Sequence, residues 1–139
     1  MEFRKFAVVE KQFDYKGHYC ICIFNHLGFR CGYVSVSTDK DYDEYDIDCH
    51  GGLTFSGVLP YDYGQNYQYY IGFDCGHFGD GIDYNEAFEY GLIGNEEFEY
   101  FSSRNLWSLY PAMTLDFVIE QCKHIVDQLE RKEKGNEKI

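Results

Sequence analysis

Three side chains that can bind a metal or transfer a proton alternate along one short segment of this chain. Asp46, Asp48 and His50 are spaced two residues apart, so in a β-strand all three would lie on one face. Gly51 and Gly52 follow, and glycine lets the backbone bend sharply or approach a ligand closely. The pattern favours a divalent-metal site or an acid–base cluster, because carboxylates and imidazoles bind Zn, Mn or Fe and also transfer protons. The alternative is a solvated polar strand face that ends in a turn.

A second group of the same residue types follows a predicted strand further along the chain. Asp74, His77 and Asp80 lie in and around a glycine-rich loop, and loops at strand ends often carry functional groups. The alternative is a tight turn in which the aspartates accept hydrogen bonds from backbone N–H groups. Cys75 is a further candidate as a ligand or nucleophile. We favour one mixed His/Asp shell built from both groups over either group alone, and the sequence leaves open whether the two groups meet in space.

The sequence therefore gives two nested sets of candidate residues. Thr54 joins the wider set because its hydroxyl follows the glycine bend and could bind a phosphate or a substrate, although an ordinary polar strand face accounts for it as well. The candidate metal ligands are His50, His77, Asp46, Asp48 and Asp74. The wider set of ligand- or partner-binding residues is Asp46, Asp48, His50, Gly51, Gly52, Thr54, Asp74, Cys75, His77 and Asp80.

The length and composition predict one domain with a substantial core. The chain has 139 residues, of which 45% are hydrophobic and 19% aromatic. Tyr and Phe favour strands, and glycine- and aspartate-rich turns separate several strand-like runs. We therefore expect a single α+β domain over residues 1–139, with a mainly antiparallel sheet and a C-terminal amphipathic helix packed on it. About six strands are expected, at 3–11, 18–24, 30–37, 45–50, 53–59 and 67–75.

The clearest helix signal lies near the C-terminus. Thr114 is suited to cap this helix, and Asp116 is favourable in its first turn. Apolar residues recur at helical spacing over 115–129 and predict a stripe that packs on the sheet. The charged residues 131–139 are expected to fray. Residues 84–110 fit either a strand hairpin or a helix followed by a loop.

The negative charge is concentrated in the middle of the chain. The formal net charge is −12, and residues 39–100 contain fifteen of the 24 acidic side chains but one base, Lys40. Such a surface repels the phosphates of nucleic acids and anionic lipids, so neither is an expected partner. It suits a cation or a basic protein, or it serves only solubility. No apolar run approaches about 18 residues, so no membrane span is expected.

The cysteines and the N-terminus indicate a reducing compartment. The chain has six cysteines and none forms a CxxC pair, which predicts free and mostly buried thiols. A short strand-like run follows the first five residues, so no signal peptide is expected. We therefore expect a cytoplasmic protein.

Four blocks of the sequence, RCGYVSV, KDYDEYDIDCHGGLTFSG, YYIGFDCGHFGD and TLDFVIEQCKHIVDQL, occur in a familiar order. They resemble a family of small proteins carried by bacteriophages, prophages and other mobile elements, for which no biochemical activity is settled. The resemblance covers roughly residues 30–130, and its most specific parts are HGGLTFSG and GFDC-x-H-x-GD. Tyr69 and Tyr70 stand where the family usually has tryptophans. The family's recurring polar positions correspond to Asp46, Asp48, His50, Asp74, His77 and Asp80.

This resemblance implies an accessory protein of a mobile element, acting in the cytoplasm of a bacterial host. Small acidic phage proteins often counter host defence, as anti-CRISPR proteins do, by binding a nuclease or trapping a signalling nucleotide. By that analogy we expect an inhibitor that binds a basic host protein or a small nucleotide through its acidic surface or its Asp/His/Gly cleft. The alternatives are a metal-dependent hydrolase acting on a nucleotide or similar small substrate, and a structural phage component.

Overall fold

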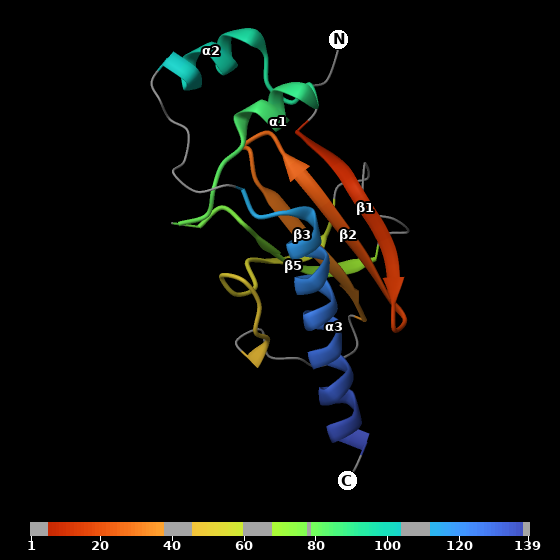
Figure 1. The fold of residues 1–139 in the computed structure, drawn as a ribbon. Coiled ribbons are helices and arrows are strands. Elements are labelled where there is room, and N and C mark those ends of the chain that lie inside the picture. Colours follow the sequence, from red (N-terminus) through yellow and green to blue (C-terminus); the bar gives the residue numbers. More distant parts are fainter. Residues whose placement is uncertain (1–5, 38–45, 60–67, 78, 104–111, 138–139) are drawn as a thin grey trace.

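A five-stranded antiparallel sheet forms the centre of the molecule in the computed structural model, which describes residues 6–37, 46–59, 68–77, 79–103 and 112–137. The strand order is β1-β2-β3-β5-β4, so the last strand in sequence lies between β3 and β4. The expected α+β fold with a C-terminal helix on an antiparallel sheet is confirmed (Figure 1). The strands are β1 (Ala7–Tyr15), β2 (His18–Asn25), β3 (Arg30–Val36), β4 (Phe55–Val58) and β5 (Tyr69–Asp74), and the helices are α1 (Tyr84–Glu89), α2 (Asn95–Ser103) and α3 (Leu115–Glu137).

Helix α3 covers one face of the sheet and forms the main core with it (Figure 1). The residues on its inner face recur at helical spacing, as the sequence predicts, and Val118, Cys122 and Ile125 have no exposed surface. Gly32 in β3 allows the close approach, because a Cβ there would lie 2.8 Å from Cys122 Sγ. The buried residues of this core are Cys20, Cys22, Val34, Ile47, Cys49, Ile71, Phe73, Cys75, Val118, Cys122, Ile125, Val126 and Leu129.

The short helices α1 and α2 lie at one end of the sheet (Figure 1). Asp83 caps α1 by accepting a 3.0 Å hydrogen bond from the backbone N–H of Glu86. Phe24 at the end of β2 packs with Ala87 and Leu92, so this end has its own small core. Residues 84–103 therefore form two helices rather than a strand hairpin, and the remainder of the ambiguous segment lies outside the described residues.

A nearly buried ion pair ties these parts together. Arg30 Nε in β3 lies 2.6 Å from Glu10 Oε1 in β1, and the two side chains are 15% and 8% exposed. The Tyr90 hydroxyl, at the end of α1, donates a 2.6 Å hydrogen bond to the other carboxylate oxygen. Arg30 also donates to the carbonyl of Met113, just before α3. This network fixes the start of α3 relative to the sheet, which positions the candidate site described below.

One local expectation is wrong. The described part of the predicted strand 45–50 is not a strand but an irregular segment that runs beside α3. The backbone of this segment forms hydrogen bonds with side-chain amides of α3 rather than with a neighbouring strand. Helix α3 continues to Glu137, so the predicted fraying from residue 131 stays a prediction. The other strands form close to their expected positions, with bounds that differ by a few residues. None of the described helices has the length and hydropathy needed to cross a bilayer.

Candidate metal site

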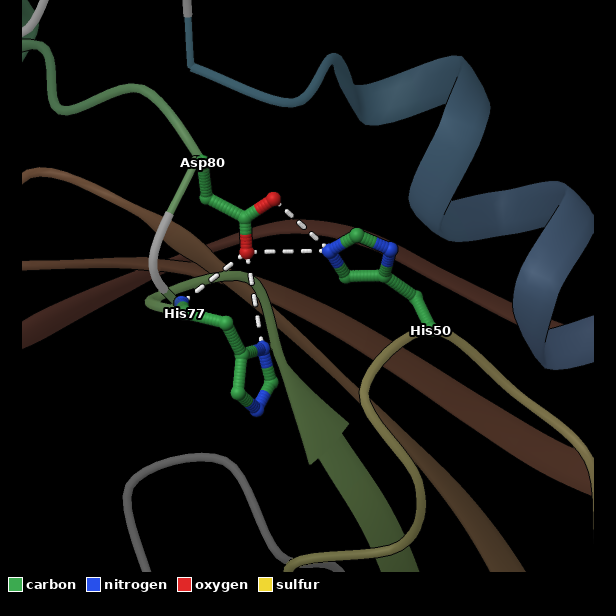
Figure 2. A group of neighbouring side chains, drawn as sticks. All are labelled: His50, His77 and Asp80. Carbon is green, nitrogen blue, oxygen red and sulfur yellow. Dashed lines mark hydrogen bonds and ion pairs between the residues drawn. The ribbon is translucent and has the colours of Figure 1, made fainter.

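His50, His77 and Asp80 meet at one end of α3, where the two candidate groups of the sequence come together (Figure 2). The Nε2 atom of His50 lies 2.8 and 2.9 Å from the two carboxylate oxygens of Asp80. The Nδ1 atom of His77 lies 3.4 Å from Asp80 Oδ2. One carboxylate thus lies between two imidazoles whose rings are 5.7 Å apart in an edge-to-face arrangement.

The loop after β5 positions His77 and Asp80 through its own hydrogen bonds. The backbone N–H of Asp80 donates to the carbonyl of His77 at 2.8 Å, which closes a tight turn. In return, the N–H of His77 donates to Asp80 Oδ2 at 3.0 Å. Gly79 within this turn has a φ of +94°, a conformation that residues with side chains rarely adopt. The turn therefore folds the Asp80 carboxylate back toward His77.

Helix α3 and the glycine bend position His50. The side-chain oxygen of Gln121 accepts a 2.8 Å hydrogen bond from the backbone N–H of His50. The ring of Phe117, one turn earlier on α3, packs at 90° to the imidazole with centroids 5.2 Å apart. Gly51 has a φ of +71°, and a Cβ at this position would collide with the His77 ring. A glycine is therefore required for the two histidines to approach each other.

The Asp80 carboxylate is nearly buried and remains ionised. Its side chain is 7% exposed, whereas those of His50 and His77 are 26% and 35% exposed. Burial acts to raise the pKa of Asp80, but hydrogen bonds from His50 and from the His77 backbone act more strongly together and hold the pKa below its usual value. A carboxylate is therefore available as an anionic ligand.

One atom of the cluster has no hydrogen bond. His77 Nδ1 is buried from solvent, and its 3.4 Å approach to Asp80 lacks the geometry of a hydrogen bond. Buried polar atoms are nearly always bonded in folded proteins, so each exception needs a physical explanation. In the tautomer whose Nδ1 carries no proton, the nitrogen lone pair and the carboxylate oxygen repel at this distance, and a cation near both would relieve that repulsion.

The donor set fits a transition metal with an open coordination position. One ligand atom from each of His50, His77 and Asp80 lies within 4.8 Å of the other two. Two imidazoles and a carboxylate are the ligands of many catalytic Zn sites and of non-haem Fe sites, which leave positions open for water or substrate. The atoms would need to move closer together to surround an ion at about 2.0–2.2 Å. No other such group of three occurs in the described part of the chain.

Three of the five predicted metal ligands, Asp46, Asp48 and Asp74, lie outside this cluster, whereas Asp80, predicted as a binding residue but not as a metal ligand, lies within it. Asp46 and Asp48 are exposed, and each contacts a basic side chain on α3 instead. Asp46 lies 3.5 Å from Lys132, and Asp48 lies 3.1 Å from His124. The structure therefore separates these two aspartates from His50, although the sequence places all three in one row.

The remaining predicted site residues lie around the cluster. Gly52 also has a positive φ, but a Cβ at this position would have no neighbour within 4 Å, so it makes no close approach to the histidines. Thr54 and Asp74 flank the cluster, and the threonine hydroxyl donates a 3.0 Å hydrogen bond to the Asp74 carboxylate. Neither residue supplies one of the three converging donor atoms.

Cys75 is not suited to act as a nucleophile. Its side chain has no exposed surface and belongs to the core beneath α3. Burial and the nearby Asp80 carboxylate raise the pKa of its thiol to about 12. The thiolate is therefore scarce at neutral pH, whereas both nucleophilic attack and metal ligation need it.

Helix α3 contributes two residues to the site that the sequence did not single out. Phe117 and Gln121 are four residues apart and lie at the edge of the apolar stripe, so both face the same side of the helix. That spacing is a usable signal, although it does not reveal which segment the two side chains contact. No family model, curated protein or solved structure matches this chain.

Proposed function

We propose that this protein binds a divalent transition metal through His50, His77 and Asp80 and acts through the open side of that metal. The observation that carries the proposal is the buried, unbonded Nδ1 of His77 facing the ionised carboxylate of Asp80. His50 Nε2 converges on the same carboxylate, so all three donors point toward one small volume (Figure 2). Zn, Mn and Fe suit this donor set.

The first test is the metal content of protein purified without a chelator or a histidine tag. We expect close to one equivalent of Zn, Mn or Fe by elemental mass spectrometry. His50→Ala and His77→Ala should each reduce the bound metal to below about a tenth of an equivalent. His124→Ala is the matched control, because His124 also lies beside an aspartate but outside the cluster. Wild-type protein that takes up none of these metals, even when titrated with them, would overturn the proposal.

The biological role that we propose for the whole protein is that of a mobile-element accessory protein that inhibits a host component. The resemblance of the sequence blocks and the acidic central segment support this role. In the described structure, α1 and α2 carry five glutamates and no basic side chain, and the half-exposed Tyr100 lies among them. Acidic surfaces steer association with basic partners. The five residues are Glu86, Glu89, Glu96, Glu97 and Glu99.

The partner proposal is tested by charge reversal. A Glu96→Lys, Glu99→Lys variant should weaken capture of the host partner and remove most of its salt dependence. Glu120→Lys on α3 is the control, because that exposed side chain lies on another helix. The proposal of an electrostatic interface would be contradicted if binding of the partner changed neither with salt concentration nor in the Glu96→Lys, Glu99→Lys variant.

A metal-dependent hydrolase is the second candidate, and the incomplete coordination shell favours it. A metal held by three protein ligands lowers the pKa of a bound water and supplies a nucleophile at neutral pH. A nucleotide or a similar small substrate would then be cleaved. Metal-loaded wild-type protein should hydrolyse such substrates, and the His50→Ala, His77→Ala double variant should not. Equal activity in both proteins would exclude this candidate.

A further inference from the structure

We propose that Asp74 is a positioning residue for the metal site: from outside the ligand shell it holds the Nε2–H of His77, so that Nδ1 faces the metal. This inference rests on the proposed metal-binding function. Asp74 Oδ1 lies 3.7 Å from His77 Nε2, which is ion-pair range and longer than a hydrogen bond.

The Asp74 carboxylate is itself held in place. Its Oδ2 accepts a 3.0 Å hydrogen bond from the hydroxyl of Thr54, on the segment between the glycine bend and β4. Its Oδ1 accepts a 3.0 Å hydrogen bond from the backbone N–H of Gly76. Asp74 also ends β5, whose ladder with β3 fixes its backbone. These bonds orient the carboxylate before any metal arrives.

The contacts of Asp80 explain why Nδ1, rather than Nε2, is the free nitrogen of His77. Asp80 Oδ2 already accepts hydrogen bonds from the His77 backbone and from His50 Nε2. A proton on the buried Nδ1 would therefore have no well-placed acceptor, whereas a proton on Nε2 faces Asp74. Neutral imidazole carries one proton, so placing it on Nε2 leaves the Nδ1 lone pair for the metal.

A carboxylate behind a ligating histidine is a recurrent arrangement in metal proteins. The outer carboxylate fixes the tautomer and ring orientation, and its loss typically lowers metal affinity by about 10–100-fold. Asp74 is not one of the three residues whose donor atoms converge, which distinguishes its role from that of a fourth ligand. Thr54 lies one hydrogen bond further from the proposed metal, because its hydroxyl bonds Asp74 rather than His77.

The experiment compares Co²⁺ and Zn²⁺ binding by wild type and three variants whose folding is checked by thermal unfolding. Asp74→Asn should weaken Co²⁺ binding by about 10–100-fold, and Thr54→Val by a smaller factor. Asp48→Asn, which removes a carboxylate beside His124 on α3 and outside the cluster, should leave affinity unchanged. The visible Co²⁺ spectrum of saturated Asp74→Asn should keep its band positions, because no ligand is lost. Long-range ¹H–¹⁵N correlation on Zn²⁺-loaded wild type should show His77 bound through Nδ1 with its proton on Nε2.

The possible results distinguish the proposed metal binding from the positioning role of Asp74. Wild-type protein that binds neither ion overturns the proposed function, and the inference with it. Wild-type binding with an unweakened Asp74→Asn variant overturns the inference alone. The inference also fails if His77 is bound through Nε2, or if the Co²⁺ bands shift in Asp74→Asn as expected for the loss of a direct ligand.

Discussion

The side-chain amide of Gln128 forms two hydrogen bonds with the backbone of Asp48. Its oxygen accepts from the Asp48 N–H at 2.7 Å, and its nitrogen donates to the Asp48 carbonyl at 2.6 Å. A helix side chain thereby supplies the pairing that a neighbouring strand would otherwise give to this irregular segment. Gln121, two turns earlier, repeats half of this pattern at His50. The position of His50 therefore depends on α3.

We expect Gln128→Ala to destabilise the protein by about 2–4 kcal/mol, because it leaves a donor and an acceptor of Asp48 without partners. Gln128 is 8% exposed, so water replaces the lost amide poorly. Gln128→Glu is the matched variant, since it keeps the acceptor but replaces the donor with a second oxygen and adds a negative charge. Denaturant unfolding measures both. An Ala variant as stable as wild type would show that these bonds contribute nothing net.

Gly51→Ala should disrupt the metal site, whereas Gly52→Ala should not. Both residues have positive φ, which costs a non-glycine residue about 1–2 kcal/mol. A Cβ at Gly51 would also collide with the His77 ring, whereas one at Gly52 meets nothing within 4 Å. The difference between the variants thus isolates the contact with His77. Equal Co²⁺ affinities in the two variants would refute this account of the glycine bend.

Arg30→Met should destabilise the protein by about 3–5 kcal/mol, because it leaves the nearly buried Glu10 without its cation. Adding Glu10→Gln in the same chain should restore part of that loss. The free energies of unfolding of both single variants and the double variant form a cycle that measures the pair. Strictly additive losses would mean that the two side chains stabilise the fold independently.

The thiols should resist modification in the native protein. All six cysteines are free and buried. Burial raises the pKa of Cys31 to about 12 and that of Cys49 to about 11. Iodoacetamide should therefore label them at neutral pH only as the protein unfolds, with rates that rise with denaturant. Rapid labelling of any cysteine in native protein would contradict this expectation.

The ion pair between Lys16 and Asp127 should add stability that disappears in acid. The Nζ of Lys16 lies 2.7 Å from Asp127 Oδ1, and this hydrogen bond holds the pKa of Asp127 below its usual value. A carboxyl whose pKa is lowered by folding stabilises the native state above its unfolded pKa. That contribution is lost as pH falls through the lower folded value. The stability difference between wild type and Asp127→Asn should therefore shrink as the pH falls from neutral through the acid range. A constant difference would contradict the linkage.

The fold class, the helix stripe and most strands are predictable from the sequence because they depend on local periodicity. The hydrophobic stripe of α3 marks its buried face, and the apolar run of β2 marks a strand that is buried on both faces, without reference to distant residues. Alternation over Asp46–His50 also indicates the right faces, since Ile47 and Cys49 are buried and Asp46 and Asp48 are exposed. The prediction of a strand there is wrong because an irregular segment with one buried face gives the same pattern.

The candidate site is predictable in part. The sequence favours one mixed His/Asp shell without showing that its two groups meet, and the structure brings His50, His77 and Asp80 together. Asp46 and Asp48 could not be separated from His50 by spacing alone, because their partners Lys132 and His124 lie on a helix far along the chain. Such pairings depend on how α3 lies across the sheet, which no local pattern specifies.

The hydrogen bonds from Gln121 and Gln128 have a consequence for the order of events during protein synthesis. They join residues that are 71 and 80 positions apart in sequence, with the helix as the later partner. While the chain is still emerging from the ribosome, His50, His77 and Asp80 are already outside, but the helix that positions His50 is not. The complete site therefore forms only after translation of α3, so the metal binding proposed above would be a late step in the maturation of this protein.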